Sequence, residues 1–115
     1  MGYYTAYSLD VSGASIEQMD RIVDFLSKRK IIGYALNDNL ECYDTVKWYD
    51  HNTDMLELSI EIPDLLFCLH GEGEDTEDLW NKYYKNGRMQ ECYAEIVYPG
   101  YDPRKLRSPI RGKQC

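Results

Sequence analysis

The stretch LWNKYYKNGRMQECYAEIVY, residues 79–98, is the part of the sequence that decides the fold. Asn86-Gly87 stands between two runs rich in aromatic residues, and this dipeptide favours the two-residue turn of a β-hairpin because both positions accept positive φ. We therefore predict a hairpin with strands over residues 79–85 and 88–98. Three prolines follow, Pro99, Pro103 and Pro109, so the hairpin is expected to be the last regular part of the chain.

Three further strands are predicted upstream of the hairpin. Residues 65–69, LLFCL, form a short continuous apolar run, which is typical of a central strand. Residues 3–11 alternate enough apolar and aromatic side chains to indicate another strand. Residues 34–43 are apolar at both ends with Asn37-Asp38-Asn39 between them, so we expect a strand that contains a loop.

Two amphipathic helices are predicted between these strands. Ser15 and Gln18 have the spacing of a capping box, and Gly33 is expected to close the first helix after a basic last turn. Apolar residues then recur at helical spacing at Ile16, Met19, Ile22, Val23 and Leu26. The second helix is expected to start at the N-capping residues Asn52, Thr53 and Asp54 and to stop at Pro63. Its apolar face consists of Met55, Leu58 and Ile62.

The order of elements becomes β-α-β-α-β-β-β, which predicts an α+β protein with a ferredoxin-like arrangement. One sheet would carry two helices on one face and end in the C-terminal hairpin, with the other face open to solvent. A chain of 115 residues fits one domain, which we place at 1–106, followed by a basic and disordered tail at 107–115. We expect no large cofactor, because a chain of this size cannot enclose one.

Charge divides the chain into an acidic body and a basic tail. Residues 1–98 hold 8 Lys and Arg against 19 Asp and Glu, a balance of −11, whereas residues 99–115 hold five basic residues and one acid, or +4. An acidic body repels a phosphate backbone, so direct nucleic-acid binding is disfavoured. The sequence shows neither a membrane span nor a signal peptide, which predicts a cytoplasmic protein.

Acidic residues and tyrosines are the candidate contacts to a protein partner. The chain contains 11 tyrosines, a residue that favours sheet packing and also protein interfaces. We predict that the open sheet face is rich in tyrosine and binds another protein. The candidate partner-binding residues are Glu72, Glu74, Asp75, Glu77, Asp78, Tyr83 and Tyr93.

A metal site is a weaker alternative. His70, Glu72 and Glu74 would share one face of a continuing strand, and imidazole with two carboxylates suits Zn, Mn or Fe. Asp50-His51 would have to supply the remaining ligands, but this spacing has no specificity on its own. The four cysteines lack the spacing of a metal knuckle. We expect Cys42, Cys68 and Cys92 to be reduced and buried in strands.

Several segments resemble small proteins encoded by bacteriophages and prophages: MGYYTAYSLDV at the start, KWYDH at 47–51, LFCLHGEGE at 66–74 and YYKNGRMQ at 83–90. The resemblance covers about residues 1–106 and extends, more distantly, to a ferredoxin-like domain of phage and plasmid proteins. It implies an inhibitor of host machinery of the anti-CRISPR or other counter-defence type, and it assigns no catalytic residue.

We therefore expect a non-enzymatic binding protein, acting in the cytoplasm of a bacterial host. It would inhibit or redirect a host protein by occupying a basic nucleic-acid-binding surface, with its acidic body competing with nucleic acid for that surface. A small metal-dependent hydrolase using His70, Glu72 and Glu74, or a virion assembly protein, remain the alternatives. The sequence does not fix the oligomeric state.

Overall fold

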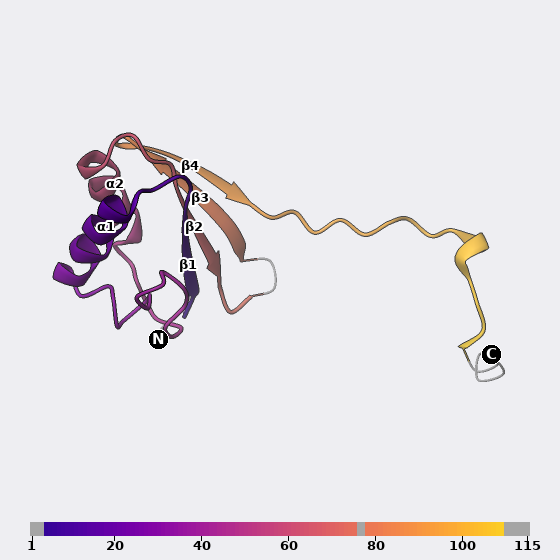
Figure 1. Ribbon diagram of the computed structural model, residues 1–115. Coiled ribbons are helices and arrows are strands. Elements are labelled where there is room, and N and C mark those ends of the chain that lie inside the picture. Colours follow the sequence, from indigo (N-terminus) through magenta and orange to yellow (C-terminus); the bar gives the residue numbers. More distant parts are fainter. Residues whose placement is uncertain (1–3, 76–77, 110–115) are drawn as a thin grey trace.

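The computed structural model describes residues 4–75 and 78–109 and contains one four-stranded sheet with two helices on one face (Figure 1). The elements are, in chain order, β1 (Ala6–Val11), α1 (Ile16–Lys28), α2 (His51–Glu61), β2 (Phe67–Glu72), β3 (Leu79–Lys85), β4 (Arg88–Tyr93) and the 3-10 turn η1 (Pro103–Lys105). The predicted α+β class and the placement of both helices on one face are confirmed. Neither helix combines the length and apolar character needed to cross a membrane, within the residues that the structure describes.

The strands follow one another across the sheet in the order β1-β2-β3-β4, and every neighbouring pair is antiparallel. β2 lies inside the sheet, as its apolar sequence predicts.

The predicted strand at residues 34–43 is wrong, because this segment forms only isolated bridges. Asn37 accepts two backbone N–H bonds with its side chain, and Leu40 adopts a φ of 65°, so the chain turns where a strand would have to continue. The two helices therefore follow each other without a strand between them, and the ferredoxin-like connectivity is not confirmed.

The irregular segment between the helices covers the outer edge of β1. Thr5 and Val46 exchange two backbone hydrogen bonds, of 3.0 and 3.1 Å, and the N–H of Leu9 donates to the carbonyl of Leu40 at 2.8 Å. Residues 40–46 thus take the place of a fifth strand at this edge. β4 forms the opposite edge of the sheet.

The hairpin forms at the predicted turn. Asn86 and Gly87 adopt φ values of 48° and 79°, as the two-residue turn requires. The turn also docks against α2, where the N–H of Gly87 donates to the Ser59 hydroxyl at 2.9 Å. The second strand ends at Tyr93, five residues earlier than predicted.

The helix termini follow the predictions in part: the capping box of the first helix is confirmed, whereas its closure at Gly33 and the capping of the second helix by Asn52, Thr53 or Asp54 are wrong. α1 starts with the capping box of Ser15 and Gln18. The helix ends at Lys28. The residue with a left-handed conformation that closes it is Lys30, in place of the predicted Gly33. α2 begins at His51, one residue before the predicted capping residues.

The core lies between the helices and one face of the sheet. Ile22 and Leu26 of α1 and Met55 and Leu58 of α2 are fully buried. The sheet contributes alternate residues to this layer, as a half-buried sheet requires. These are Tyr7, Leu9, Phe67, Leu69, Trp80, Lys82 and Tyr84.

Beyond β4 the chain continues as a C-terminal arm, residues 95–109. The arm runs away from the helices and the sheet in an extended path that includes η1 (Figure 1). It gives the molecule extents of 59 × 31 × 28 Å. Every residue of the arm is exposed except Asp102, which is half-buried.

Candidate functional site

The open face of the sheet is polar, which contradicts the prediction that it is rich in tyrosine. The register and the alternation of burial place mostly polar side chains on it: Ser8, Asp10, Cys68, His70, Glu72, Asn81, Tyr83, Lys85, Arg88, Gln90 and Cys92, together with Ala6 and Leu79. Tyr83 is the one tyrosine among them. The sequence pattern did not predict this, because tyrosine is favoured on both faces of a strand. Tyr7 and Tyr84 lie on the buried face of the sheet.

The aromatic side chains gather instead around a pocket at one end of the helix-covered face. We call it the aromatic pocket; its volume is about 220 Å³. Aromatic rings provide most of its walls, and these belong to Tyr7, Trp48, Tyr49, His51, Trp80 and Tyr93. Four chain segments therefore meet here: the start of β1, residues 47–51, the start of β3 and the end of β4.

The rings pack in favourable geometries. Tyr7 meets Trp48 edge to face with ring centroids 5.2 Å apart, and it meets Trp80 in the same way at 6.0 Å. The imidazole of His51 stacks on Trp80 at 5.2 Å with an interplanar angle of 16°. Such pairs add to the stability that burial alone provides, so the pocket has a preformed aromatic floor.

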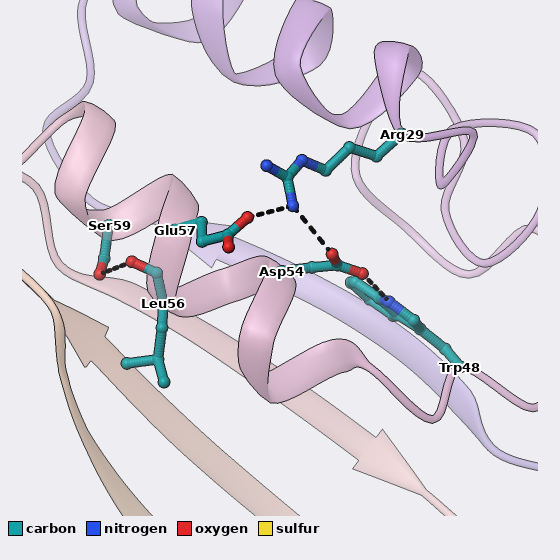
Figure 2. A network of polar contacts seen from close by, with 6 residues as sticks. All are labelled: Arg29, Trp48, Asp54, Leu56, Glu57 and Ser59. Carbon is teal, nitrogen blue, oxygen red and sulfur yellow. Dashed lines mark hydrogen bonds and ion pairs between the residues drawn. The ribbon is translucent and has the colours of Figure 1, made fainter.

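A polar network that starts at the indole N–H holds the ring of Trp48 in place. Its indole N–H donates to Asp54 at 2.7 Å, and Arg29 donates to the other oxygen of the same carboxylate at 3.1 Å. Arg29 also pairs with Glu57, so α1 and α2 are joined through this network (Figure 2). Asp54 thus fixes the orientation of a ring that lines the aromatic pocket.

A buried lysine lies at the base of the pocket. Lys82 is only 4% exposed, and its ammonium lies 2.9 Å from Nε2 of His51 and 3.3 Å from Glu91. The same ammonium stands 4.5 Å above the ring of Trp80. Burial lowers the pKa of His51, and the positive charge of Lys82 lowers it further. The sequence did not single out Lys82 or Glu91, although a lysine inside an aromatic strand is a signal that was available.

The acidic β2–β3 turn adjoins this pocket. The N–H of Gly73 donates to the carbonyl of Asp78 at 2.8 Å, and Asp78 in turn donates to Asp75 at 3.0 Å, so backbone bonds hold the turn. The side chain of Glu74 accepts from the N–H of Tyr4 at 3.0 Å. Glu77 lies outside the described residues.

Of the two predicted tyrosine contacts, the structure brings only Tyr93 to the acidic turn. Tyr93 and Asp78 line the aromatic pocket together, and Tyr93 is 55% exposed. Partial burial and the negative charges of Glu91 and Asp78 raise the pKa of Tyr93. Tyr83 lies on the opposite, open face.

Further exposed tyrosines extend the aromatic surface beyond the pocket. The ammonium of Lys47 lies 5.0 Å from the ring centroid of Tyr4, and the Tyr34 hydroxyl donates to the carbonyl of Lys47 at 3.4 Å. Tyr49, which is 72% exposed, lies between the aromatic pocket and a neighbouring hollow that Tyr34 also lines. We call the four exposed tyrosines near the pocket together with the acidic turn the acidic aromatic surface: Tyr4, Tyr34, Tyr49, Tyr93, Glu74, Asp75 and Asp78. The predicted contact Glu72 is not part of it, because its side chain lies beside His70 on the open face.

The predicted metal ligands do not converge. His70 contacts Asn81 at 2.7 Å and Glu72 at 3.2 Å, whereas Glu74 turns toward the backbone of Tyr4. His51 is on the helix-covered face, stacked on Trp80, and so lies across the sheet from His70. Within residues 4–75 and 78–109 no group of three or more metal-binding side chains is found.

The cysteines are more exposed than predicted. Cys42 is exposed because its segment forms a loop in place of a strand. Cys68 and Cys92 are half-buried on the open face. Burial raises the pKa of the Cys68 thiol, which opposes its use as a nucleophile.

Comparison of the chain with protein-family models, with curated proteins and with solved structures found no match.

Proposed function

We propose that this chain is a non-enzymatic binding protein that uses the acidic aromatic surface to occupy a basic, nucleic-acid-binding surface of a host protein. The setting we propose is inhibition of a bacterial host protein such as a defence nuclease, with a phage as the source of the inhibitor. The observation that carries the proposal is that Asp78 of the acidic turn and the exposed Tyr93 line one pocket. Charge and aromatic contact area therefore occupy the same part of the molecule.

Physical chemistry supports this pairing of features. Carboxylates around a contact surface steer a basic partner toward it and raise the association rate. Exposed tyrosines then provide rigid contact area, with a hydroxyl that remains able to hydrogen-bond. Glu74 and Asp78 have no ion-pair partner within the described part of the chain, so their charge is available to a partner.

The preformed pocket supports the same function. Ring packing and the Arg29–Asp54–Trp48 network hold its floor before any partner arrives. A surface that is already ordered loses little conformational entropy on binding. A bulky partner side chain of about the size of the pocket would fill it without rearrangement of the core.

The test is capture of partners from a bacterial lysate on the full-length chain, followed by competition with nucleic acid. The site variant is Glu74→Lys/Asp78→Lys, and the matched control is Glu17→Lys/Asp20→Lys. The control makes the same change of net charge on the exposed surface of α1, away from the acidic turn (Figure 1). We expect one captured protein to bind the parent and the control but not the site variant. Single-stranded or duplex nucleic acid should release this protein from the parent. A partner that binds all three forms equally, or that nucleic acid does not displace, overturns the proposal.

A further inference from the structure

The C-terminal arm carries apolar side chains that the rest of its own chain leaves exposed. Val97 is 79% exposed, Tyr98 83%, Tyr101 78% and Leu106 66%. Apolar groups gathered on one extended segment mark a site of interaction with another molecule. The arm therefore has the character of a contact segment.

The charge of the arm is opposite to that of the body. Arg104, Lys105 and Arg107 lie in the described part of the arm, where Glu95 and Asp102 are the acids. Residues 99–115 as a whole carry +4, against −11 for residues 1–98. The acidic body of a second copy therefore offers the basic arm a surface of opposite charge.

The sheet offers an unpaired edge to receive such a segment. In a hairpin with a two-residue turn, Lys85 and Arg88 form a hydrogen-bonded pair, and such pairs then recur at every second position. The bond from the N–H of Ala94 to the carbonyl of Leu79, at 2.8 Å, continues this pattern. The backbone groups of Met89, Glu91 and Tyr93 consequently point away from β3, toward the edge of the sheet.

The β4 edge is unpaired in the part of the chain that the structure describes, whereas residues 40–46 cover the β1 edge through backbone hydrogen bonds to Thr5 and Leu9. An exposed strand edge is a template for pairing with a further extended segment. Within the described residues, β4 is the last strand of the sheet and has a neighbour on one side only.

The arm of a second copy can reach this edge more directly than the arm of the same chain. The arm leaves β4 without a turn and runs away from the sheet (Figure 1), so its own β4 lies behind it. A second copy related by a twofold axis would approach with its arm antiparallel to β4. The contact would then form twice, once with each arm.

We propose that two copies of this chain associate by exchanging their C-terminal arms, each arm pairing with the exposed edge of β4 in the other copy. The apolar residues of the arm become covered in this dimer, and its basic residues meet the acidic body of the second copy. This dimer is a property of the chain itself and can be tested without a host protein. Its edge includes Tyr93, which also lines the aromatic pocket, so the arm of a second copy and a host protein would compete for this part of the surface.

The first test measures the mass of the full chain in solution by light scattering over a range of concentrations. We expect twice the chain mass of 13.5 kDa at high concentration and a shift toward monomer as salt is raised. Val97→Asp should give a monomer. Ile16→Asp is the matched control, because Ile16 is 82% exposed on α1 and the change is the same; this variant should remain a dimer. A parent that is monomeric at every concentration overturns the proposal, and so does a dimer that both variants preserve.

The second test locates the contact by amide hydrogen exchange. The amides of Met89, Glu91 and Tyr93 should become protected as concentration rises, whereas Val97→Asp should leave them in fast exchange at every concentration. Protection of these amides in a monomer would mean that the arm folds back on its own chain, which would overturn the exchange of arms. A dimer without any such protection would place the contact elsewhere and would also contradict the proposal.

Discussion

The ammonium of Lys82 donates a hydrogen bond to Nε2 of His51 over 2.9 Å, while Nδ1 of the same ring lies 2.8 Å from the carbonyl oxygen of Trp48. A carbonyl can only accept, so Nδ1 carries the proton. An ammonium can only donate, so Nε2 must offer its lone pair. These two contacts fix His51 as a neutral imidazole in one tautomer, and protonation would place a second positive charge against Lys82.

Stability should therefore fall on acidification through the titration range of His51. Burial keeps the pKa of His51 in the folded protein below its ordinary value, so the unfolded chain binds this proton more readily. The contribution of neutral His51 is complete above the ordinary histidine pKa of about 6.5 and is lost as pH falls from there through the lower, folded value. Denaturant unfolding between pH 7 and pH 5 measures the slope.

The variant His51→Gln separates this residue from the other titrating groups. Glutamine is neutral and can both donate to Trp48 and accept from Lys82, so the variant should lose most of this pH dependence. His70→Gln is the control, since His70 lies on the open face beside Asn81 and Glu72. A parent and a His51→Gln protein with the same slope would contradict the assigned tautomer.

Gly71 is expected to tolerate no side chain at all. A Cβ built there would stand 2.2 Å from the ring of Trp80, which cannot move without breaking its stack on His51. Gly71→Ala should therefore destabilise the fold by about 1–3 kcal/mol or more, as overpacking of a core does. Thermal unfolding and tryptophan fluorescence measure the effect. Gly100→Ala is the control, because nothing lies within 4 Å of that position.

The turn of the hairpin gives a prediction that depends on backbone conformation. Gly87 has a φ of 79°, and a Cβ there would meet the side chain of Ile60 at 3.3 Å. Gly87→Val should cost roughly 1–3 kcal/mol through backbone strain. Gly87→Asn should cost less, since asparagine accepts this conformation more easily. Equal thermal midpoints for parent and valine variant would argue against the importance of this turn.

Thiol labelling should distinguish the cysteines by exposure and pKa. In a Cys115→Ser background, Cys42 should react first because it is exposed, and Cys68 should react more slowly because burial raises its pKa. Cys42→Ser should remove the fast phase. Mass spectrometry of the labelled protein at successive times identifies each site, and early modification of Cys68 would contradict its position on the sheet.

The comparison of sequence with structure shows which signals are local. The Asn86-Gly87 turn and the Ser15/Gln18 capping box were predictable because each depends on a few neighbouring residues. Residues 34–43 were predicted wrongly because their apolar ends suit a strand, while the side chain of Asn37 and the conformation of Leu40 bend the chain. A loop that buries a few separate apolar residues has the same hydropathy pattern as a strand, so hydropathy alone does not distinguish the two.

The candidate site depended on contacts between distant residues, which no local pattern reveals. Trp48, His51, Trp80 and Lys82 come from two parts of the chain, and their meeting depends on the docking of α2 against β3. The acidic turn was visible in the sequence, but the choice between Tyr83 and Tyr93 required the strand register. One position along β3 or β4 decides which face of the sheet a side chain occupies.

The opposite positions of Tyr83 and Tyr93 give the sharpest test of the proposed function. Tyr93 lines the aromatic pocket beside Asp78, whereas Tyr83 lies on the open face. With the partner protein captured as described above, Tyr93→Ala should raise the dissociation rate, because truncation of an aromatic anchor acts mainly on dissociation. Tyr83→Ala should leave both rates close to those of the parent. Glu74→Lys/Asp78→Lys should slow association and weaken its dependence on salt, since exposed charges act on the encounter. Binding kinetics at two salt concentrations measure all of these effects, and faster dissociation of Tyr83→Ala but not of Tyr93→Ala would move the contact to the open face.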